Sequence, residues 1–276
     1  MRFDWYASTI PAAPTVLVAA LADGLGATKT KTGNGRHGYS ERIELRQDSG
    51  ELAATVLCGG NGYPHAYASG DRTDAFVVLV RELWAGHRVT RMDSCEDFDA
   101  PGAFDKLVAA ALKMADRLGL KVSHVGDWHR GIDGRTLYIG SPSSPVRLRI
   151  YEKGIQLRRE FPPDASHLFS SDWVRVELQV RPQKEAKAAA ALCTPEGAWG
   201  YAGWSKGFAD ELCGLQVPRV QQVRWRPSDY ERSYRFMVRQ FGPTIRQGIE
   251  LHGSWDAFAA TLRDDVEADG RRRRLG

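Results

Sequence analysis

The chain lacks long hydrophobic runs, closely spaced cysteines and a strong net charge. Of its 276 residues, 42% are hydrophobic and 26% are charged, with a net charge of +4. This composition excludes a disordered tail, a collagen-like fibre and a small disulfide-stapled protein. Residues 12–25 form the longest apolar segment, but Asp23 interrupts it, and a bilayer-spanning helix needs roughly 20 apolar residues.

Other motifs are missing as well. The four cysteines are far apart and include no CxxC pair, which argues against disulfides and a structural zinc site. The opening MRFDWYAS has an acid at position 4 and no apolar stretch, so we expect no signal peptide. GxGxxG and GxxxxGK[ST] are absent, which excludes a nucleotide-driven motor of these classes. We therefore expect a reduced, cytoplasmic protein without membrane contact.

Basic residues are concentrated in three stretches. Residues 145–160 hold five Lys and Arg against two Glu, and residues 217–249 hold seven Arg against two acids. Four consecutive arginines, Arg271 to Arg274, lie near the end of the chain. Such stripes suit a phosphate backbone, although a solvated surface produces the same pattern.

Hydrophobic periodicity predicts an α+β fold. Period-2 alternation predicts strands, and apolar residues at helical spacing predict helices. We expect an antiparallel sheet with flanking helices over residues 1–190 and a helical, basic region over residues 191–276. Strands are expected at 41–46, 51–58, 87–98, 135–141, 146–154 and 172–181. Helices are expected at 13–25, 71–84 with Asp71 as its cap, 103–118, 184–192, 229–242 and 254–266, while 30–40 and 59–70 are expected to be turns and loops.

Three of these strands place polar residues on one face. Their sequences are RMDSCED at 91–97, RLRIYEK at 147–153 and RVELQ at 175–179. If the faces adjoin, carboxylates meet a tyrosine surrounded by cations. Carboxylates without His or Cys favour Mg²⁺ or Mn²⁺, and a phenol beside cations can ionise and attack a phosphodiester. A buried network of ion pairs is the competing interpretation.

The order of the motifs supports the chemical interpretation. TLYIGSPSS followed by RIYEK, together with RMDSCEDF and WVRVEL, resembles the signature of the Rep_trans replication initiation factors. The resemblance extends over roughly residues 60–182. It implies an HUH-endonuclease-like, Rep-type catalytic domain in residues 1–190 and a C-terminal region that binds DNA. Members of this family initiate rolling-circle replication of plasmids and filamentous phages, and relaxase relatives nick the origins of conjugative elements.

The resemblance also assigns roles to individual residues. It implies that Tyr151 nicks one DNA strand at an origin, forming a 5′-phosphotyrosyl ester and a free 3′-hydroxyl. Asp93 and Glu177 match the positions expected to hold Mg²⁺ or Mn²⁺, with Asp97 as a further candidate. The cations implied to contact the reacting phosphate or its neighbours are Arg149, Lys153 and Arg175.

Origin DNA, single-stranded or in a hairpin, is the implied partner. Host helicase and polymerase are implied as further partners, and a homodimer is compatible with the resemblance. Pro142 stands where the family has an arginine, so a non-catalytic DNA-binding regulator or degenerate initiator on the same scaffold is the alternative. The resemblance assigns no role to His65, which is a metal ligand or an ordinary hydrogen-bonded histidine. Tyr230 and Tyr234 are rival or second nucleophiles by their position beside Arg235.

Overall fold

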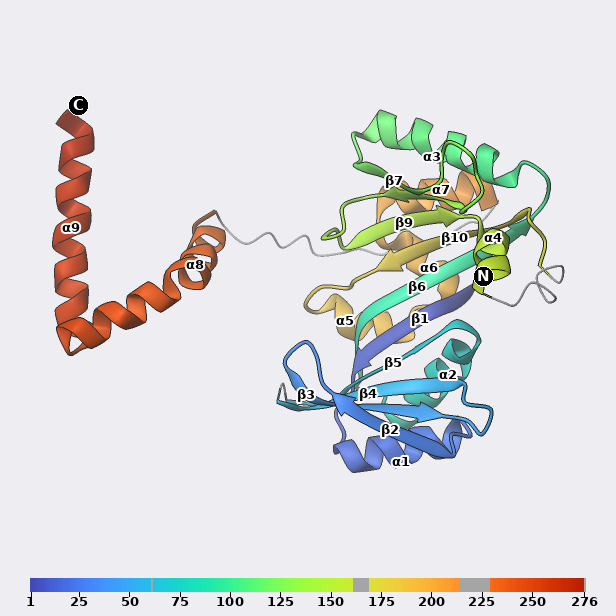
Figure 1. Ribbon diagram of the computed structural model, residues 1–276, viewed down its shortest axis with the longest axis horizontal. Coiled ribbons are helices and arrows are strands. Elements are labelled where there is room, and N and C mark those ends of the chain that lie inside the picture. Colours follow the sequence, from blue (N-terminus) through green and yellow to red (C-terminus); the bar gives the residue numbers. More distant parts are fainter. Residues whose placement is uncertain (61, 161–168, 214–228, 276) are drawn as a thin grey trace. The chain divides into compact units, whose positions relative to one another are not determined.

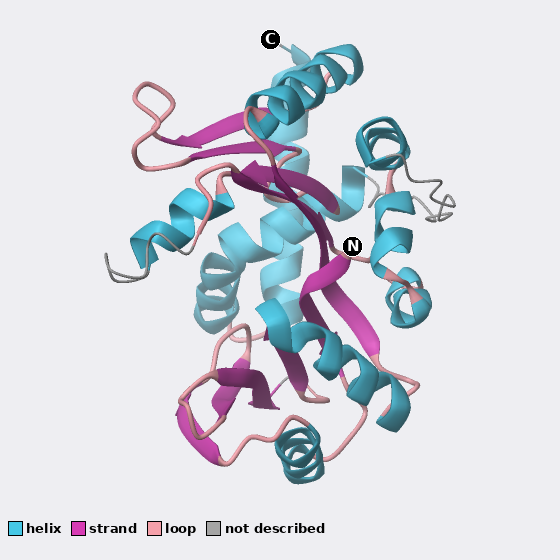
Figure 2. Ribbon diagram, turned by 90° about the vertical axis from the view of Figure 1, so that its right-hand side faces the viewer, coloured by secondary structure: helices cyan, strands magenta, loops and turns pink. Residues whose placement is uncertain are grey.

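A single ten-stranded antiparallel sheet organises most of the chain. The computed structural model describes residues 1–60, 62–160, 169–213 and 229–275, with the backbone alone for 212–213, 229–236, 239 and 270–275. The strands follow the order β2-β3-β4-β5-β1-β6-β10-β9-β8-β7, and Figure 2 shows the twist of the sheet. Their bounds are β1 Arg2–Thr9, β2 Lys29–Asn34, β3 Tyr39–Arg46, β4 Leu52–Gly60, β5 His65–Ser69, β6 Arg88–Asp99, β7 Val122–Gly126, β8 Arg135–Ile139, β9 Val146–Tyr151 and β10 Trp173–Val180.

Helices cover one face of this sheet, apart from α4, which lies beside Tyr151 at the end of β9. The helices are α1 Pro14–Gly24, α2 Thr73–Leu83 (after a 3₁₀ turn, η1 Gly70–Arg72), α3 Ala103–Leu118, α4 Lys153–Glu160, α5 Ala186–Ala189, α6 Pro195–Ala198 and α7 Gly203–Cys213, with the 3₁₀ turns η3 Ala190–Leu192 and η4 Trp199–Tyr201. The main core combines alternate strand residues, such as Tyr6, Met92 and Val176, with helix residues such as Leu17 and Phe76. The opposite side chains of the strands therefore form a second, polar face. The α+β fold and antiparallel sheet predicted from periodicity are confirmed.

Helix α3 shows how directly the sequence encodes the covered face. Its buried residues follow the helical repeat and are Phe104, Leu107, Val108, Ala111, Met114 and Ala115. Gly119 then adopts a left-handed conformation with φ of 60° and ends the helix. A side chain at this position would strain the backbone, so the glycine makes a sharp stop.

The N-terminal strand was missed by the sequence analysis. β1 lies between β5 and β6 in the middle of the sheet, and Figure 1 shows it beside β6. A register shift between Phe3 and Trp5 interrupts its alternation. This irregularity places Asp4 within reach of Arg175 on the polar face, and it also hides the strand from a period-2 search.

Several local predictions were wrong. Residues 29–34 and 65–69 form strands β2 and β5 rather than turns and loops, because pairing with β3, β4 and β1 overrides their weak local preference. Asp71 lies in η1 and does not cap α2, whose first turn has no side-chain cap. The strand expected over 146–154 ends at Tyr151, and Lys153 begins α4.

The turn into α4 depends on a glycine. A β-carbon at Gly154 would lie 1.7 Å from the carbonyl oxygen of Ser170. The backbone of α4 therefore approaches the segment before β10 more closely than any side chain permits. This contact keeps the start of α4, and with it Lys153, beside the end of β9.

The chain divides into two compact units, residues 1–222 and 223–276. The expected boundary at 190 differs because Trp199 and Phe208 are buried in the core of the first unit. The second unit contains α8 Asp229–His252 and α9 Trp255–Leu275, so the C-terminal region is helical as predicted. Both helices run past their predicted ends at 242 and 266. Within the described residues, no helix is long and apolar enough to cross a membrane.

Candidate nicking site on the polar face of the sheet

The three strands that carry the motifs are neighbours. In the sheet order β6-β10-β9, Arg175 pairs with both Asp97 and Tyr151, while Glu177 lies between Cys95 and Arg149. The sequence analysis predicted such a face only if the strands adjoined, and they do. Because side chains alternate along a strand, these residues all project from the polar face, opposite the core.

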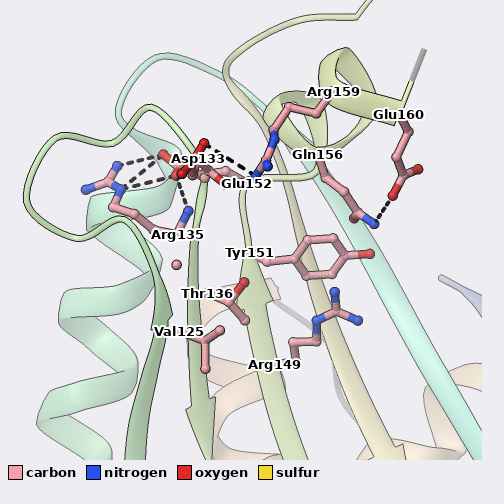
Figure 3. Close-up of a pocket in the computed structure, with 12 residues that line it drawn as sticks. Val125, Asp133, Arg135, Thr136, Arg149, Tyr151, Glu152, Gln156, Arg159 and Glu160 are labelled. Atoms are coloured by element: carbon pink, nitrogen blue, oxygen red, sulfur yellow. Dashed lines mark hydrogen bonds and ion pairs between the residues drawn. The ribbon is translucent and has the colours of Figure 1, made fainter.

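Tyr151 lies at the end of β9 with cations around its ring. The Arg149 guanidinium carbon is 3.8 Å from the ring centroid, and the Lys153 ammonium is 5.9 Å from it. Figure 3 shows the ring between Arg149 and Gln156. The structure thus brings together all four residues expected to act on the phosphate, because Arg175 lies directly opposite Tyr151 on β10. Lys153 reaches the ring from the first residue of a helix, not from the strand face.

The hydroxyl of Tyr151 is held in its neutral form. Only 4% of the residue is exposed, and burial, followed by the charge of Glu177, raises the pKa of its phenol. Arg149 and Arg175 oppose this rise by stabilising the phenolate. In the protein alone, the balance of these effects therefore favours the neutral phenol.

Asp93 and Glu177 form a buried pair of carboxylates. They are diagonal neighbours on β6 and β10, which places their β-carbons about 6–8 Å apart. Burial raises the pKa of Asp93 against the ion pair with Arg91, and burial together with Asp93 raises the pKa of Glu177 to about 7. Arg149 stabilises the Glu177 carboxylate, with Nη1 3.6 Å from Oε2.

The raised pKa values of this pair suit a divalent cation, which would have to displace Arg91 from the two Asp93 oxygens, whereas the lowered pKa of Asp97 does not. A cation bound between two buried carboxylates reduces their electrostatic repulsion. Mg²⁺ is commonly held by one or two carboxylates together with water and substrate phosphates. No cluster of three or more His, Cys, Asp or Glu suited to a metal occurs among the described residues. Asp93 and Glu177 would therefore be the protein's own ligands.

Asp97 belongs to an ion-pair network with Arg175 instead. Arg175 donates from Nε and Nη2 to the two Asp97 oxygens at 2.7 and 2.8 Å, and from Nη1 to Asp4 at 2.8 Å. Burial favours the neutral acid, but these bonds hold the pKa of Asp97 below its usual value. The competing interpretation of a buried ion-pair network thus describes this part of the face. Asp4 belongs to the network and was not singled out from the sequence.

A pocket of about 490 Å³ adjoins Tyr151. It lies between the β7–β8 hairpin, the end of β9 and α4, and its lining includes Arg149, Thr136 and Gln156. Arg135 lines one side of the pocket and forms an ion pair with Glu152, with its Nη2 donating to Glu152 Oε1 at 2.7 Å. Figure 3 shows this ion pair. Glu152, the residue after the tyrosine, therefore fastens β9 to β8 and fixes the position of Tyr151.

Arginines from other positions in the sequence lie near Pro142. The Pro142 carbonyl accepts a hydrogen bond from Arg181 at 2.5 Å. Nearby on β9, the Arg147 guanidinium lies 3.9 Å from the Tyr138 ring centroid. Its Nε has no hydrogen-bond partner among the described residues. Arg147 is thus a cation on the polar face, two residues from Arg149, held against the Tyr138 ring.

The remaining sequence candidates belong to other helices and strands. His65 is on β5, and its ring is 6.2 Å from that of Tyr39. Burial, assisted by His37, lowers its pKa to about 4, so it is neutral near pH 7. Tyr230 and Tyr234 belong to α8, but their side chains, like those of Arg271 to Arg274, lie outside the described residues.

Comparisons with known proteins bear on the family and the fold. Residues 96–205 match the family model described as "Replication initiation factor", Rep_trans. The matched segment contains Asp97, Tyr151 and Glu177 and begins three residues after Asp93. No curated protein matches the chain.

A solved structure shares the fold. The rolling-circle replication initiator protein from Geobacillus stearothermophilus matches with a TM-score of 0.50 and 17% sequence identity, over 79% of this chain and 98% of the other. The family model and this structure together confirm that the chain resembles the Rep_trans replication initiation factors, with the family pattern in residues 96–205 and the fold of a rolling-circle initiator.

Proposed function

We propose that this protein starts rolling-circle replication by nicking one strand of origin DNA with Tyr151. The observation that carries the proposal is the position of Tyr151, with Arg149 on its ring and the Asp93–Glu177 pair on the adjoining strands. The elements served are a plasmid, a filamentous phage or an integrative element. The protein itself acts as an endonuclease and strand transferase.

In the proposed reaction the Tyr151 oxygen attacks the scissile phosphorus. A bond from this oxygen to phosphorus forms, and the bond from phosphorus to the 3′ oxygen breaks. The phenol releases its proton to solvent, and the departing 3′ oxygen takes a proton from water. The products are a 5′-phosphotyrosyl ester and a free 3′-hydroxyl for a polymerase. Arg149 and Lys153 neutralise charge that develops on the phosphate, while Arg175 acts through the electrostatic field from its buried position.

Asp93 and Glu177 would hold Mg²⁺ or Mn²⁺ in this reaction. When bound, such an ion polarises the phosphodiester and supplies the positive charge that ionisation of the phenol requires. The raised pKa values of both carboxylates support this assignment, because a nearby cation favours their charged forms. Asp97 is not part of this proposed ligand set.

Origin binding is proposed to involve both units of the chain. The polar face would receive single-stranded DNA or the unpaired part of a hairpin, and the basic helical region after residue 190 would contact duplex phosphates. Host helicase and polymerase would complete replication. A homodimer is also compatible with the proposal.

The test is nicking of supercoiled DNA that carries the element's own origin, with Mg²⁺ or Mn²⁺. The wild-type chain is expected to give nicked circles and a covalent DNA–protein adduct on denaturing gels. Tyr151→Phe should lose both, on the order of 10³-fold or more in rate, because it removes the nucleophile. Tyr138→Phe is the matched control, since Tyr138 lies on the same face under Arg147, and it should retain activity. Nicking that survives Tyr151→Phe would contradict the assignment.

A non-catalytic DNA-binding regulator is the second candidate. It is favoured by the burial of Tyr151 and by the raised pKa of its phenol, which describe an unreactive tyrosine. This alternative predicts origin binding without nicking in either metal. The same assay therefore distinguishes the two functions.

A further inference from the structure

Glu152 lies at the point where the chain leaves β9 and enters α4. Its backbone carbonyl accepts a hydrogen bond from the Gln156 amide at 3.1 Å. This bond spans four residues, as in the first turn of an α-helix. The carbonyl thus belongs to the helix rather than to the ladder between β9 and β8.

The Glu152 side chain continues the pairing with β8 instead. Its Oε2 accepts a hydrogen bond from the Arg135 backbone amide at 2.7 Å, and the Glu152 amide donates to the Arg135 carbonyl at 3.2 Å. A side-chain oxygen therefore extends the pairing one residue beyond the last residue of β9. This task requires an acceptor at the end of the side chain, which a carboxylate or an amide supplies.

The Arg135 side chain binds the same carboxylate and connects it to α3. Its Nη2 donates to Glu152 Oε1 at 2.7 Å (Figure 3), and its Nη1 donates to Asp105, in the first turn of α3, at 2.9 Å. The guanidinium carbon also lies 4.3 Å from the centroid of the Phe104 ring, which is buried in the core. The Arg135–Glu152 pair therefore ties the end of β9 to a helix on the covered face.

The two neighbours of Glu152 in the chain both have a proposed role in nicking. Tyr151 precedes it on β9, and Lys153 follows it as the first residue of α4. Glu152 is only 8% exposed and is held through both its backbone and its side chain. Because the neighbours are joined to it covalently, the position of Glu152 determines where the phenol lies relative to its cations.

We propose that Arg135 is a positioning residue for nicking, which acts through Glu152 on Tyr151 and Lys153. Arg135 affects the geometry of the nucleophile rather than the phosphate, because its guanidinium is engaged by Glu152 and Asp105. A displacement of about 1 Å far from the reacting atoms can slow a reaction by on the order of 100-fold. The role in nicking rests on the proposed function, whereas the mechanical link rests on these contacts alone.

The kinetic test measures single-turnover nicking of supercoiled origin DNA in Mn²⁺ over a range of protein concentrations. Arg135→Met keeps an apolar side chain beside Phe104 and removes both ion pairs. Its maximal nicking rate is expected to fall roughly 10- to 100-fold. The half-saturating protein concentration should stay within about twofold of wild type, because the pair is not proposed to bind DNA. An unchanged maximal rate would overturn the proposal.

Two Glu152 variants test the need for an acceptor. Glu152→Gln keeps an oxygen for the Arg135 amide, whereas Glu152→Ala removes it. The glutamine variant should therefore lose clearly less of the maximal rate than the alanine variant. Equal losses in the two folded variants would overturn the role of Glu152. Thermal unfolding by circular dichroism identifies variants that fail to fold, and Arg135→Met with Glu152→Gln then carries the test.

Arg46→Met is the matched control. Arg46 forms an ion pair of the same kind with Glu44 on β3, with Nη2 2.7 Å from Oε2. Five strands lie between β3 and β9 in the sheet. Loss of this pair should therefore leave the maximal nicking rate and the half-saturating concentration unchanged.

A spectroscopic measurement tests the link without nicking. In protein labelled with ¹³C at tyrosine Cζ, the Tyr151 signal is the one that is missing from Tyr151→Phe. Arg135→Met should shift this signal, because the cations around the ring change their distances, and Arg46→Met should not. An unshifted signal in Arg135→Met would overturn the positioning role. A shifted signal in a protein whose wild type never nicks origin DNA would support the link and contradict the proposed function.

Discussion

The two halves of the polar face are held together in different ways. In the charged half, formed by the polar residues of β6, β10 and β9, Arg175 and Glu177 are at most 5% exposed, and each has an oppositely charged partner. In the aromatic half, formed by Trp5, Tyr67, His65 and Tyr39 on β1, β5 and β3, ring stacking between Trp5 and Tyr67 takes the place of ion pairs. Arg91 contacts both halves. One face of the sheet thus joins a region whose ion pairs depend on protonation to a region that is held together by contacts between aromatic rings.

This difference has physical consequences for binding. Charges in the buried, low-dielectric half respond strongly to pH and divalent cations. Stacked rings respond to neither. Changes of pH or of divalent cation should therefore act mainly on the charged half.

The largest expected effect tests the role of ion pairs in the charged half. Arg175→Met should lower the free energy of unfolding by about 3 kcal/mol, the lower end for breaking a buried ion pair, because Asp97 and Asp4 retain some exposure. Urea denaturation measures it. Arg72→Met removes an exposed pair with Glu51 and should cost less than about 1 kcal/mol. Equal losses in the two variants would contradict the distinction.

The next effect concerns pH. Glu177 has a pKa of about 7 in the folded chain against 4.5 when unperturbed. The folded state therefore holds the proton more tightly, and this stabilisation is full below pH 4.5 and lost as pH rises through 7. The loss amounts to at most about 3 kcal/mol. Urea denaturation at several pH values, in a metal chelator, should show this fall in wild type and a weaker one in Glu177→Gln.

The comparison with Glu177→Gln is essential because His65 changes the stability with pH in the opposite direction. Its lowered pKa makes the folded state more stable as pH rises from about 4 to 6.5. This contribution is common to both proteins and cancels in the difference. Added Mn²⁺ should restore stability to wild type at pH 8 but not to Glu177→Gln. The same pH dependence in both proteins would remove Glu177 from the proposed metal site.

The smallest effect concerns a single phosphate contact. Arg147→Gln should weaken binding of a fluorescein-labelled oligothymidylate a few-fold and lower the salt slope by about 0.7, because it removes a cation from the polar face two residues from Arg149. Fluorescence anisotropy at several salt concentrations measures both. Arg117→Gln, on the exposed surface of α3, serves as the control. An unchanged slope in Arg147→Gln would restrict phosphate binding to Arg149 and its neighbours.

Much of the fold was predictable because its signals are local. The amphipathic repeat of residues 103–118 defines α3 between its observed ends, and alternation identifies β6, β9 and β10 with small errors at their ends. Where the local signal is weak the prediction failed, as in β2 and β5. Those segments become strands only because neighbouring strands supply hydrogen-bond partners.

The sequence by itself determined which residues are candidates for the chemistry: RIYEK, RMDSCED and WVRVEL contain Tyr151, Asp93 and Glu177 in the family order. Only the tertiary structure determined which of these residues lie next to one another. Strand order places β10 between β6 and β9, pairs Asp97 with Arg175, and inserts β1 with Asp4 and Trp5 into the middle of the sheet. The reason is that residues far apart in the chain become neighbours through backbone pairing, and the register of that pairing depends on the packing of the whole core.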